Sequence, residues 1–147
     1  MALRNAFGDL ASEESLKKVK DVLTSGSQKT INVPTSSGGL KVYRNLSLTS
    51  RGANIKSSTG QIYGWYFFNH SSSVRYVKLY DNARTPAVGR DRPFMTIPLP
   101  ARGGANVNFT SGITLSKGLG IAVTTGVADS DTGSPSANEV VVNIIYF

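Results

Sequence analysis

Over most of its length, this chain alternates short apolar runs with short polar ones. From Thr30 onward, runs rich in β-branched and aromatic residues are separated by clusters of Gly, Pro, Asn and Ser, a pattern typical of β-sandwiches and barrels. No segment long enough for a crossover helix separates the runs, so the pattern favours antiparallel sheets. The predicted strands are 30–33, 40–48, 61–69, 74–81, 94–99, 105–109, 112–115, 118–125 and 139–146, with a short strand at 54–56 left open.

Residues 12–24 form the one segment whose pattern predicts a helix. Ser12 can cap the free amide groups of the first turn, where Glu13 and Glu14 favour the helix dipole. A helix of this length is marginal alone, so its narrow apolar stripe is expected to dock on the same domain or on another copy. The stripe consists of Leu16, Val19 and Leu23.

These elements predict an all-β fold, an antiparallel β-sandwich of jelly-roll type. An N-terminal arm with one short helix precedes the sandwich in the sequence. The arm is assigned to residues 1–29 and the sandwich to residues 30–147. A chain of 147 residues buries roughly two-thirds of its unfolded surface, which suffices for one core. Because the chain has no cysteine, disulfides and thiolate metal sites are not expected.

Two of the predicted strands are apolar on both faces, whereas a strand of a two-layer fold needs only one apolar face. In residues 61–69, strict alternation places Ile62 on the same face as Tyr66 and Phe68, and residues 139–146 repeat the two-faced pattern. The second face must be covered by the N-terminal segment, by a loop or by another subunit, and we predict packing between subunits. The residues assigned to this subunit interface are Tyr63, Trp65, Phe67, Tyr76, Tyr80, Val141, Ile145 and Phe147.

Groups suited to catalysis are sparse, with one histidine and carboxylates scattered singly through turns. His70 follows a predicted strand in a serine-rich turn, where its neighbours cannot also supply an oxyanion hole and an orienting acid. We therefore expect no enzyme and no cofactor. Asp129 and Asp131 are spaced like the start of a calcium loop, but the twelfth position is Val140 instead of the required Glu. Cation binding by this loop stays open.

The net charge of +7 is unevenly distributed, since no basic residue follows Lys117. A basic chain with aromatic residues on strands could bind single-stranded nucleic acid. Its basic residues are spread widely, and no sequence motif of a nucleic-acid-binding family accompanies them. We therefore expect these residues to be ordinary surface charges. No run of about 18 apolar residues occurs, so no membrane span is expected. The start of the chain also lacks the apolar core of a signal peptide.

The chain opens with Ala2-Leu-Arg-Asn-Ala-Phe-Gly-Asp-Leu-Ala11, which resembles the start of many small virion proteins of tailed phages. A set of short motifs in residues 62–147 resembles a β domain from the same phage genomes. Members of that group are described as structural proteins, so the resemblance implies a virion location and transfers no catalytic residue. Residues 25–60 resemble no such protein. The motifs are Tyr76-Val-Lys-Leu-Tyr80, Ala83-Arg-Thr-Pro-Ala-Val-Gly89, Thr96-Ile-Pro-Leu-Pro100, Phe109-Thr-Ser-Gly-Ile113, Gly118-Leu-Gly-Ile-Ala-Val123 and Ala128-Asp-Ser-Asp131.

Together these features lead us to expect a capsid decoration or cement protein, made in the host cytoplasm and carried on the virion. It is expected to form a homo-oligomer, with a trimer as the favoured state, and to bind the major capsid protein or another virion protein. Two alternatives stay open: a tail, neck or fibre-attachment protein, and a carbohydrate-binding module that uses exposed aromatics such as Tyr43 or Tyr80. The arm residues assigned to the shell or a neighbour are Leu3, Phe7, Leu10, Leu16, Val19 and Leu23.

Overall fold

The computed structural model describes residues 13–24 and 39–147. The chain divides into two units, Met1–Ser37 and Gly38–Phe147. Several predictions fall outside the described residues: the boundary between residues 29 and 30, the strand at 30–33, and the arm residues Leu3, Phe7 and Leu10.

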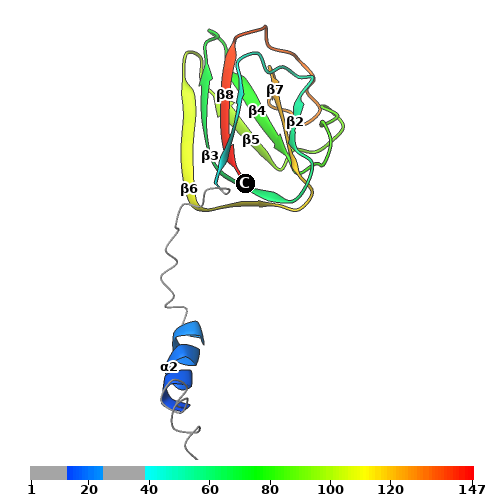
Figure 1. The fold of residues 1–147 in the computed structure, drawn as a ribbon. Helices are drawn as coiled ribbons and strands as arrows, with labels where there is room; N and C mark the ends of the chain where they lie inside the picture. Colours follow the sequence, from blue (N-terminus) through cyan, green and yellow to red (C-terminus); the bar gives the residue numbers. More distant parts are fainter. Residues whose placement is uncertain (1–12, 25–38) are drawn as a thin grey trace, which may run out of the picture. The chain divides into compact units, whose positions relative to one another are not determined.

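The described part of the first unit is helix α2, Glu13–Thr24 (Figure 1), which confirms the predicted helix. The Lys18 ammonium lies 3.2 Å from the Glu14 carboxylate one turn earlier, a spacing that adds a little helix stability. Leu16 and Val19, two members of the predicted apolar stripe, are exposed. The side chain of the third member, Leu23, is not among those described.

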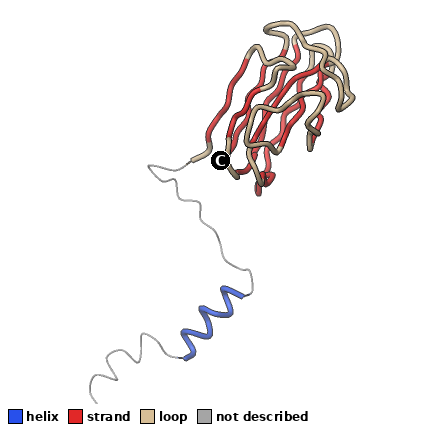
Figure 2. The backbone as a smooth tube through the Cα atoms, turned by 90° about the vertical axis from the view of Figure 1, so that its right-hand side faces the viewer, coloured by secondary structure: helices blue, strands red, loops and turns tan. Residues whose placement is uncertain are grey.

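The second unit, which we call the β unit, consists of two four-stranded antiparallel sheets (Figures 1 and 2). Sheet A has the strand order β1-β8-β3-β6, and sheet B has the order β2-β7-β4-β5. The prediction of antiparallel sheets is therefore confirmed. The strands are β1 Lys41–Asn45, β2 Ala53–Lys56, β3 Gly60–Asn69, β4 Arg75–Tyr80, β5 Met95–Leu99, β6 Gly104–Leu115, β7 Leu119–Thr124 and β8 Val140–Tyr146.

The pairing of the strands follows a simple rule along the chain. β4 pairs with β5, β3 with β6, β2 with β7 and β1 with β8, all antiparallel. Two further antiparallel pairs, β3 with β8 and β4 with β7, join neighbouring strands into the two sheets. The chain thus behaves as one long antiparallel ribbon whose successive pairs belong alternately to sheet A and sheet B.

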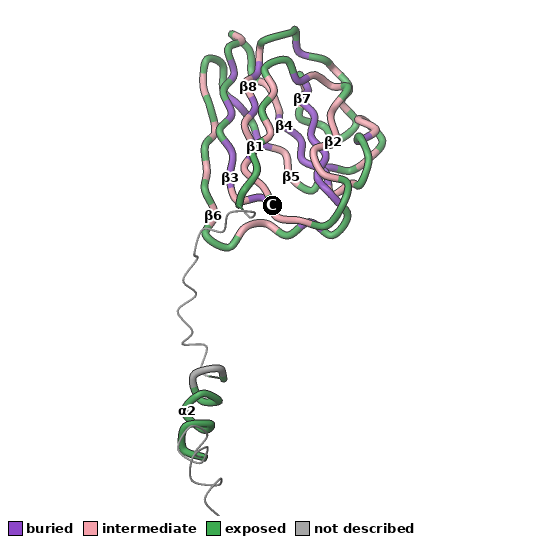
Figure 3. The backbone as a smooth tube through the Cα atoms, viewed as in Figure 1, coloured by how far each residue is buried: buried purple, intermediate pink, exposed green. Residues whose placement is uncertain are grey.

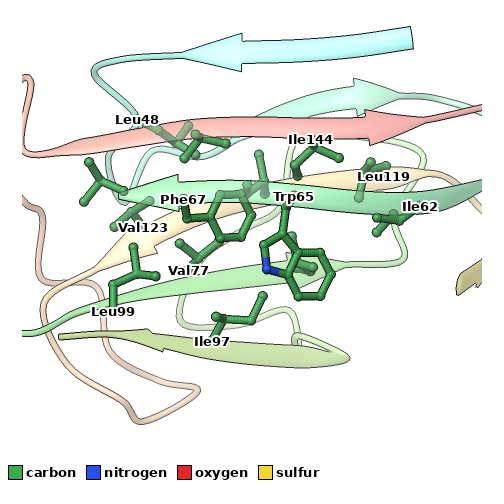
Figure 4. Close-up of a cluster of buried hydrophobic side chains, with 14 of the residues drawn as sticks. Leu48, Ile62, Trp65, Phe67, Val77, Ile97, Leu99, Leu119, Val123 and Ile144 are labelled. Carbon is green, nitrogen blue, oxygen red and sulfur yellow. The ribbon is translucent and has the colours of Figure 1, made fainter. Parts of the chain in front are cut away.

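Side chains from both sheets form one hydrophobic core (Figure 4). The rings of Trp65 and Phe67 stack with centroids 5.6 Å apart, and Phe109 meets Trp65 edge-on at 5.4 Å. Aromatic pairs in these geometries add to the free energy gained by burial alone. The buried members of the core are Leu48, Ile62, Trp65, Phe67, Val77, Leu79, Ile97, Leu99, Leu115, Leu119, Ile121, Val123, Val140, Val142 and Ile144.

The alternation of inward and outward side chains breaks once along β3. Just after Ile62 the register shifts against both β6 and β8, so that Tyr63 occupies a β-bulge. The bulge returns Ile62 to the core face, where it is fully buried together with Trp65. The prediction that Ile62 shares a face with Tyr66 and Phe68 is therefore wrong, because simple alternation holds only on each side of the bulge.

Local hydrogen bonds and one glycine account for two further differences from the predicted strands. β1 ends at Asn45 because the Asn45 carboxamide oxygen accepts the backbone N–H of Ser47 at 2.8 Å, which turns the chain. The runs 105–109 and 112–115 belong to a single strand, β6. Gly112 has a φ of +73°, which a glycine adopts without strain, and it carries β6 through the irregularity opposite the bulge of β3.

Candidate interaction surface

Loops of the same chain cover the middle of the outer face of sheet B. All six residues of β7 are buried (Figure 3). The loop that follows β4 places Pro86 on β7, because a Cβ at Gly120 would lie 3.0 Å from the Pro86 ring. The loop between β7 and β8 lies over Lys78, whose ammonium donates hydrogen bonds to the carbonyl oxygens of Ala128 and Asp131. These loops cover β7 and the adjoining part of β4, whereas Pro98 on β5 is exposed.

The long loop 126–138 contacts its own sheet. Lys78 beneath it is fully buried, and burial lowers the pKa of its ammonium, with Asp131 and Asp129 opposing the change. The Asp131 carboxylate accepts the backbone N–H groups of Gly126 at 3.0 Å and Gly133 at 3.1 Å. This Asx-turn chemistry accounts for the position of Asp131 without a cation.

Tyr80 also lies under these loops and is fully buried. Among the described residues, its buried hydroxyl has no hydrogen-bond partner. Burial raises the pKa of Tyr80 to about 12, and the carboxylates of Asp129 and Asp91 act in the same direction. The assignment of Tyr80 to a subunit interface, and to a carbohydrate platform, is therefore wrong, because no partner can reach this side chain in the folded β unit.

Replacing Tyr80 with phenylalanine is expected to raise the free energy of unfolding by about 1–2 kcal/mol, because it removes a buried hydroxyl that has no partner. Since the folded pKa of about 12 exceeds the ordinary value of 10.0, the unfolded chain ionises first. The stability of the wild-type protein should therefore fall as pH rises from 10 toward 12. The Tyr80→Phe variant should not show the loss of stability that comes from Tyr80 ionisation. Urea titrations of both proteins at neutral and alkaline pH would measure the difference.

The matched control is Tyr43→Phe, because the Tyr43 hydroxyl accepts a hydrogen bond from the Asn45 amide at 3.0 Å. This variant should lose stability at neutral pH, typically about 1 kcal/mol. A Tyr80→Phe variant less stable than the wild type at neutral pH would show that the Tyr80 hydroxyl has a partner.

The outer face of sheet A is open to solvent within the described part of the chain. Val42 on β1 is 64% exposed, and Tyr66 and Phe68 on β3 are 43% and 40% exposed. Val141 and Ile145 on β8 are half-buried between these two strands. These five side chains, with Asn143 between Val141 and Ile145 on β8, make up a mostly apolar face across three strands, which we call the sheet A face. A patch of this kind usually marks a contact with another molecule.

The polar groups beside the sheet A face bond mainly to one another. The Tyr66 hydroxyl lies 2.9 Å from the Asn108 amide nitrogen, which donates to it. The Asn143 amide donates to the backbone oxygen of Tyr66 at 3.3 Å. The His70 ring packs edge-on against Phe68 with centroids 4.7 Å apart. Because these polar groups already have partners, covering the face leaves few of them unpaired.

The strands that carry most of the sheet A face contain no charged residue. β3, β6 and β8 include no Asp, Glu, Lys or Arg, although the whole chain has a net charge of +7. Over these strands a docked partner is therefore held by apolar contact and hydrogen bonds, whereas the exposed Arg44 adds a charge at the β1 edge.

The structure separates the residues that the sequence assigned to a subunit interface. Trp65 and Phe67 belong to the core of the β unit, so their assignment to an interface is corrected. Tyr63 and Tyr76 are half-buried. Val141, Ile145 and the exposed Phe147 lie on or next to the open side of sheet A. Sequence reasoning missed Val42, Tyr66 and Phe68 as surface residues, although the two-faced pattern of residues 61–69 was the signal for Tyr66 and Phe68.

The described residues contain no group of three or more His, Cys, Asp or Glu side chains placed to hold a metal ion. In the turn at His70, the Ser71 hydroxyl accepts the backbone N–H of Ser73 at 3.1 Å, as turn serines do. No helix in the described parts of the chain is long and apolar enough to cross a membrane. No protein-family model matches the chain, and no curated protein matches it either.

Proposed function

We propose that this protein is a non-enzymatic structural protein of a tailed-phage virion that decorates or cements the capsid. The observation that carries the proposal is the open, apolar sheet A face, because a face of this kind marks a contact with another protein. Helix α2 offers a second contact through Leu16 and Val19, which are exposed. A chain with two contact surfaces can link shell subunits, and the shell then cannot open without losing those contacts.

We further propose that the β unit is a sandwich with jelly-roll topology. The strand orders β1-β8-β3-β6 and β2-β7-β4-β5 support this proposal, because winding a long antiparallel ribbon into two sheets produces them. Jelly rolls are common in viral capsid proteins and in lectins. The topology therefore suits a shell protein, although a fold by itself assigns no function.

The proposed partners are other copies of the chain and the major capsid protein or another virion protein. The proposed site of action is the outer surface of the capsid, after synthesis in the host cytoplasm. We assign attachment to the arm, residues 2–24, because its helix exposes Leu16 and Val19 and is too short to be stable alone. The trimer expected from the sequence stays a prediction.

Deleting residues 2–24 is expected to abolish attachment to capsids that lack the protein, while the β unit stays folded around its own core. Co-sedimentation with capsids measures attachment, and circular dichroism checks the fold. A sharper variant, Leu16→Lys with Val19→Lys, keeps good helix formers but removes the apolar stripe. Its matched control is Lys17→Ala, which keeps the stripe. Full attachment of the deletion variant would show that the arm does not attach the protein to the capsid.

The location within the virion needs a separate measurement. A decoration protein should be present in hundreds of copies over the shell, whereas a tail, neck or fibre-attachment protein is present in a few copies at one vertex. Quantitative mass spectrometry of purified particles, together with their imaging, distinguishes these locations. A low copy number would favour the tail or neck alternative.

One observation favours carbohydrate binding as a second candidate function. Tyr66 and Phe68 are exposed on the same face of β3, and the exposed Asn106 and Asn108 lie on the neighbouring strand β6. Aromatic rings flanked by carboxamides suit neutral sugars, which offer apolar faces and hydroxyl groups. Titration of the protein with neutral host polysaccharides tests this function, since Phe68→Ala should then weaken the binding and Val127→Ala, in a loop of the β unit, should not.

A further inference from the structure

Three of the four sheet edges in the β unit are protected against pairing with another strand. β1 is five residues long and exposes Lys41 and Arg44. β2 is four residues long, and its register is broken after Asn54. β5 contains Pro98, which has no N–H to donate. Short length, charge, bulges and proline are the devices by which natural sheets prevent edge-to-edge association.

The fourth edge, β6, carries none of these devices along its first half. β6 is the longest strand, at 12 residues, and contains neither a charged residue nor a proline. Its first five residues, Gly104–Asn108, pair in unbroken register with β3. No described strand pairs with the opposite side of β6, which forms the outer edge of sheet A (Figure 1). An edge strand leaves alternate N–H and C=O groups unpaired.

The side chains of β6 that face the core are also incompletely covered. Ala105, Val107 and Phe109 pack against the core but remain half-buried. Phe109 reaches the ring of Trp65, 5.4 Å away, from this edge. One more strand beside β6 would pair its free backbone groups and would also extend the row of apolar side chains along the edge of the core.

We propose that the β6 strand of a second copy of this chain pairs antiparallel with β6, so that the two A sheets form one continuous sheet. The charge distribution directs a second copy to this edge. Two chains that each carry +7 repel one another over most surfaces, but β6 is uncharged, so the backbones can approach there. The nearest basic residues, Arg102 and Lys117, lie outside β6.

Two identical antiparallel strands that pair with each other are related by a two-fold axis. The pairing therefore gives a dimer, in contrast to the trimer expected from the sequence. It uses an edge of sheet A and leaves the sheet A face and helix α2 available to other partners. The inference concerns the protein in solution and does not depend on the proposed role in a virion.

Cysteine cross-linking tests the pairing directly, because the chain has no cysteine of its own. Residues directly opposite one another in such a pair have Cβ atoms about 4.5–5.5 Å apart, within reach of a short thiol cross-linker. The two-fold axis crosses β6 at one position, so at least one of the full-length Asn106→Cys and Asn108→Cys variants, both at exposed positions of β6, should form covalent dimers. The effective thiol concentration in the pair is on the order of mM, so at micromolar protein the reaction should be at least about 100-fold faster than for a control.

The control is Val127→Cys, which is 61% exposed but lies in the loop between β7 and β8. The pairing is overturned if neither β6 variant cross-links faster than this control. A cross-linked species of trimer mass would overturn it equally, because a two-fold pair joins only two chains.

Sedimentation of the uncross-linked protein gives an independent answer. The wild-type protein should be a dimer, and Asn106→Lys, which sets like charges beside each other at the paired edge, should raise the dissociation constant by at least about tenfold. Asn143→Lys places the same charge on β8, away from the edge, and should leave the dimer intact. Amide hydrogen exchange in β6 should slow as the dimer forms. A monomeric or trimeric wild-type protein, or equal effects of the two lysines, would contradict the pairing.

Discussion

Replacing Phe67 with alanine is expected to lower the free energy of unfolding by about 3–5 kcal/mol, the usual cost of emptying a buried aromatic site. Phe67 is 1% exposed and stacks on Trp65 between the two sheets. The cavity would open in the middle of the core, where neighbours from both sheets cannot collapse into it without separating strand pairs. Urea denaturation at neutral pH, followed by tryptophan fluorescence or circular dichroism, measures the loss.

The adjacent residue provides a matched control. Phe68 is on the opposite face of β3 and is 40% exposed, so Phe68→Ala should change the free energy of unfolding by about 1 kcal/mol or less. The two variants remove the same atoms from neighbouring positions and thereby test which face of β3 lies inside. Similar losses of stability in both variants would mean that the sheet A face is covered in the free protein. The proposal that it is an open contact surface would then be wrong.

Asn69→Ala is expected to cost about 2–4 kcal/mol, because it leaves several buried backbone groups without partners. The Asn69 side chain is fully buried at the end of β3. Its amide donates to the carbonyl oxygens of Ser73 at 2.8 Å, Pro100 at 3.0 Å and Leu99 at 3.2 Å. Its carbonyl oxygen accepts the backbone N–H of Ser71 at 2.9 Å. One side chain thus joins the β3–β4 turn to the end of β5.

The comparison for this variant is Asn143→Ala. Asn143 makes one hydrogen bond from its side chain, to the backbone oxygen of Tyr66 at 3.3 Å near the surface, so its loss should cost less than about 1 kcal/mol. Thermal or urea unfolding of both variants measures the difference. If Asn69→Ala proves as mild as Asn143→Ala, water has replaced the lost amide and the site is less closed than its burial indicates.

The proposed dimer would change how the rest of the surface is used. With β6 paired, the two sheet A faces would become parts of one larger surface on a continuous sheet, charged only toward its two β1 edges. A larger surface offers more area to a capsid or a polysaccharide than one β unit alone, and two linked copies of helix α2 would bind with higher avidity. Measuring attachment for wild type and for Asn106→Lys therefore connects the solution state to the proposed function.

Most strands were predictable because their residues carry local information. β4 and β7 are runs of β-branched, aromatic and aliphatic residues bounded by turn residues, and such runs disfavour helices wherever they occur. Helix α2 was predictable for a similar reason, since its acidic first turn and helical apolar spacing are local features. In each case the decisive interactions lie within a few residues of one another.

The faces of the strands were not predictable in the same way. Ile62 lies in the core because of the bulge at Tyr63, and that bulge depends on the register with β6 and β8, far away in the chain. Lys78 is fully buried because a loop about 50 residues later supplies carbonyl oxygens for its ammonium. No pattern within β4 distinguishes this lysine from an exposed one.

By itself, the sequence determined that the β unit would be built from short antiparallel strands, that a short helix would precede it, and that two strands would be apolar on both faces. Only the tertiary structure decided which of those faces is closed and which is open. Loops cover the middle of the outer face of sheet B, whereas no described segment covers that of sheet A. The physical reason is that alternation along a strand sets neighbouring side chains on opposite faces, while the cover over each face comes from segments distant in the chain.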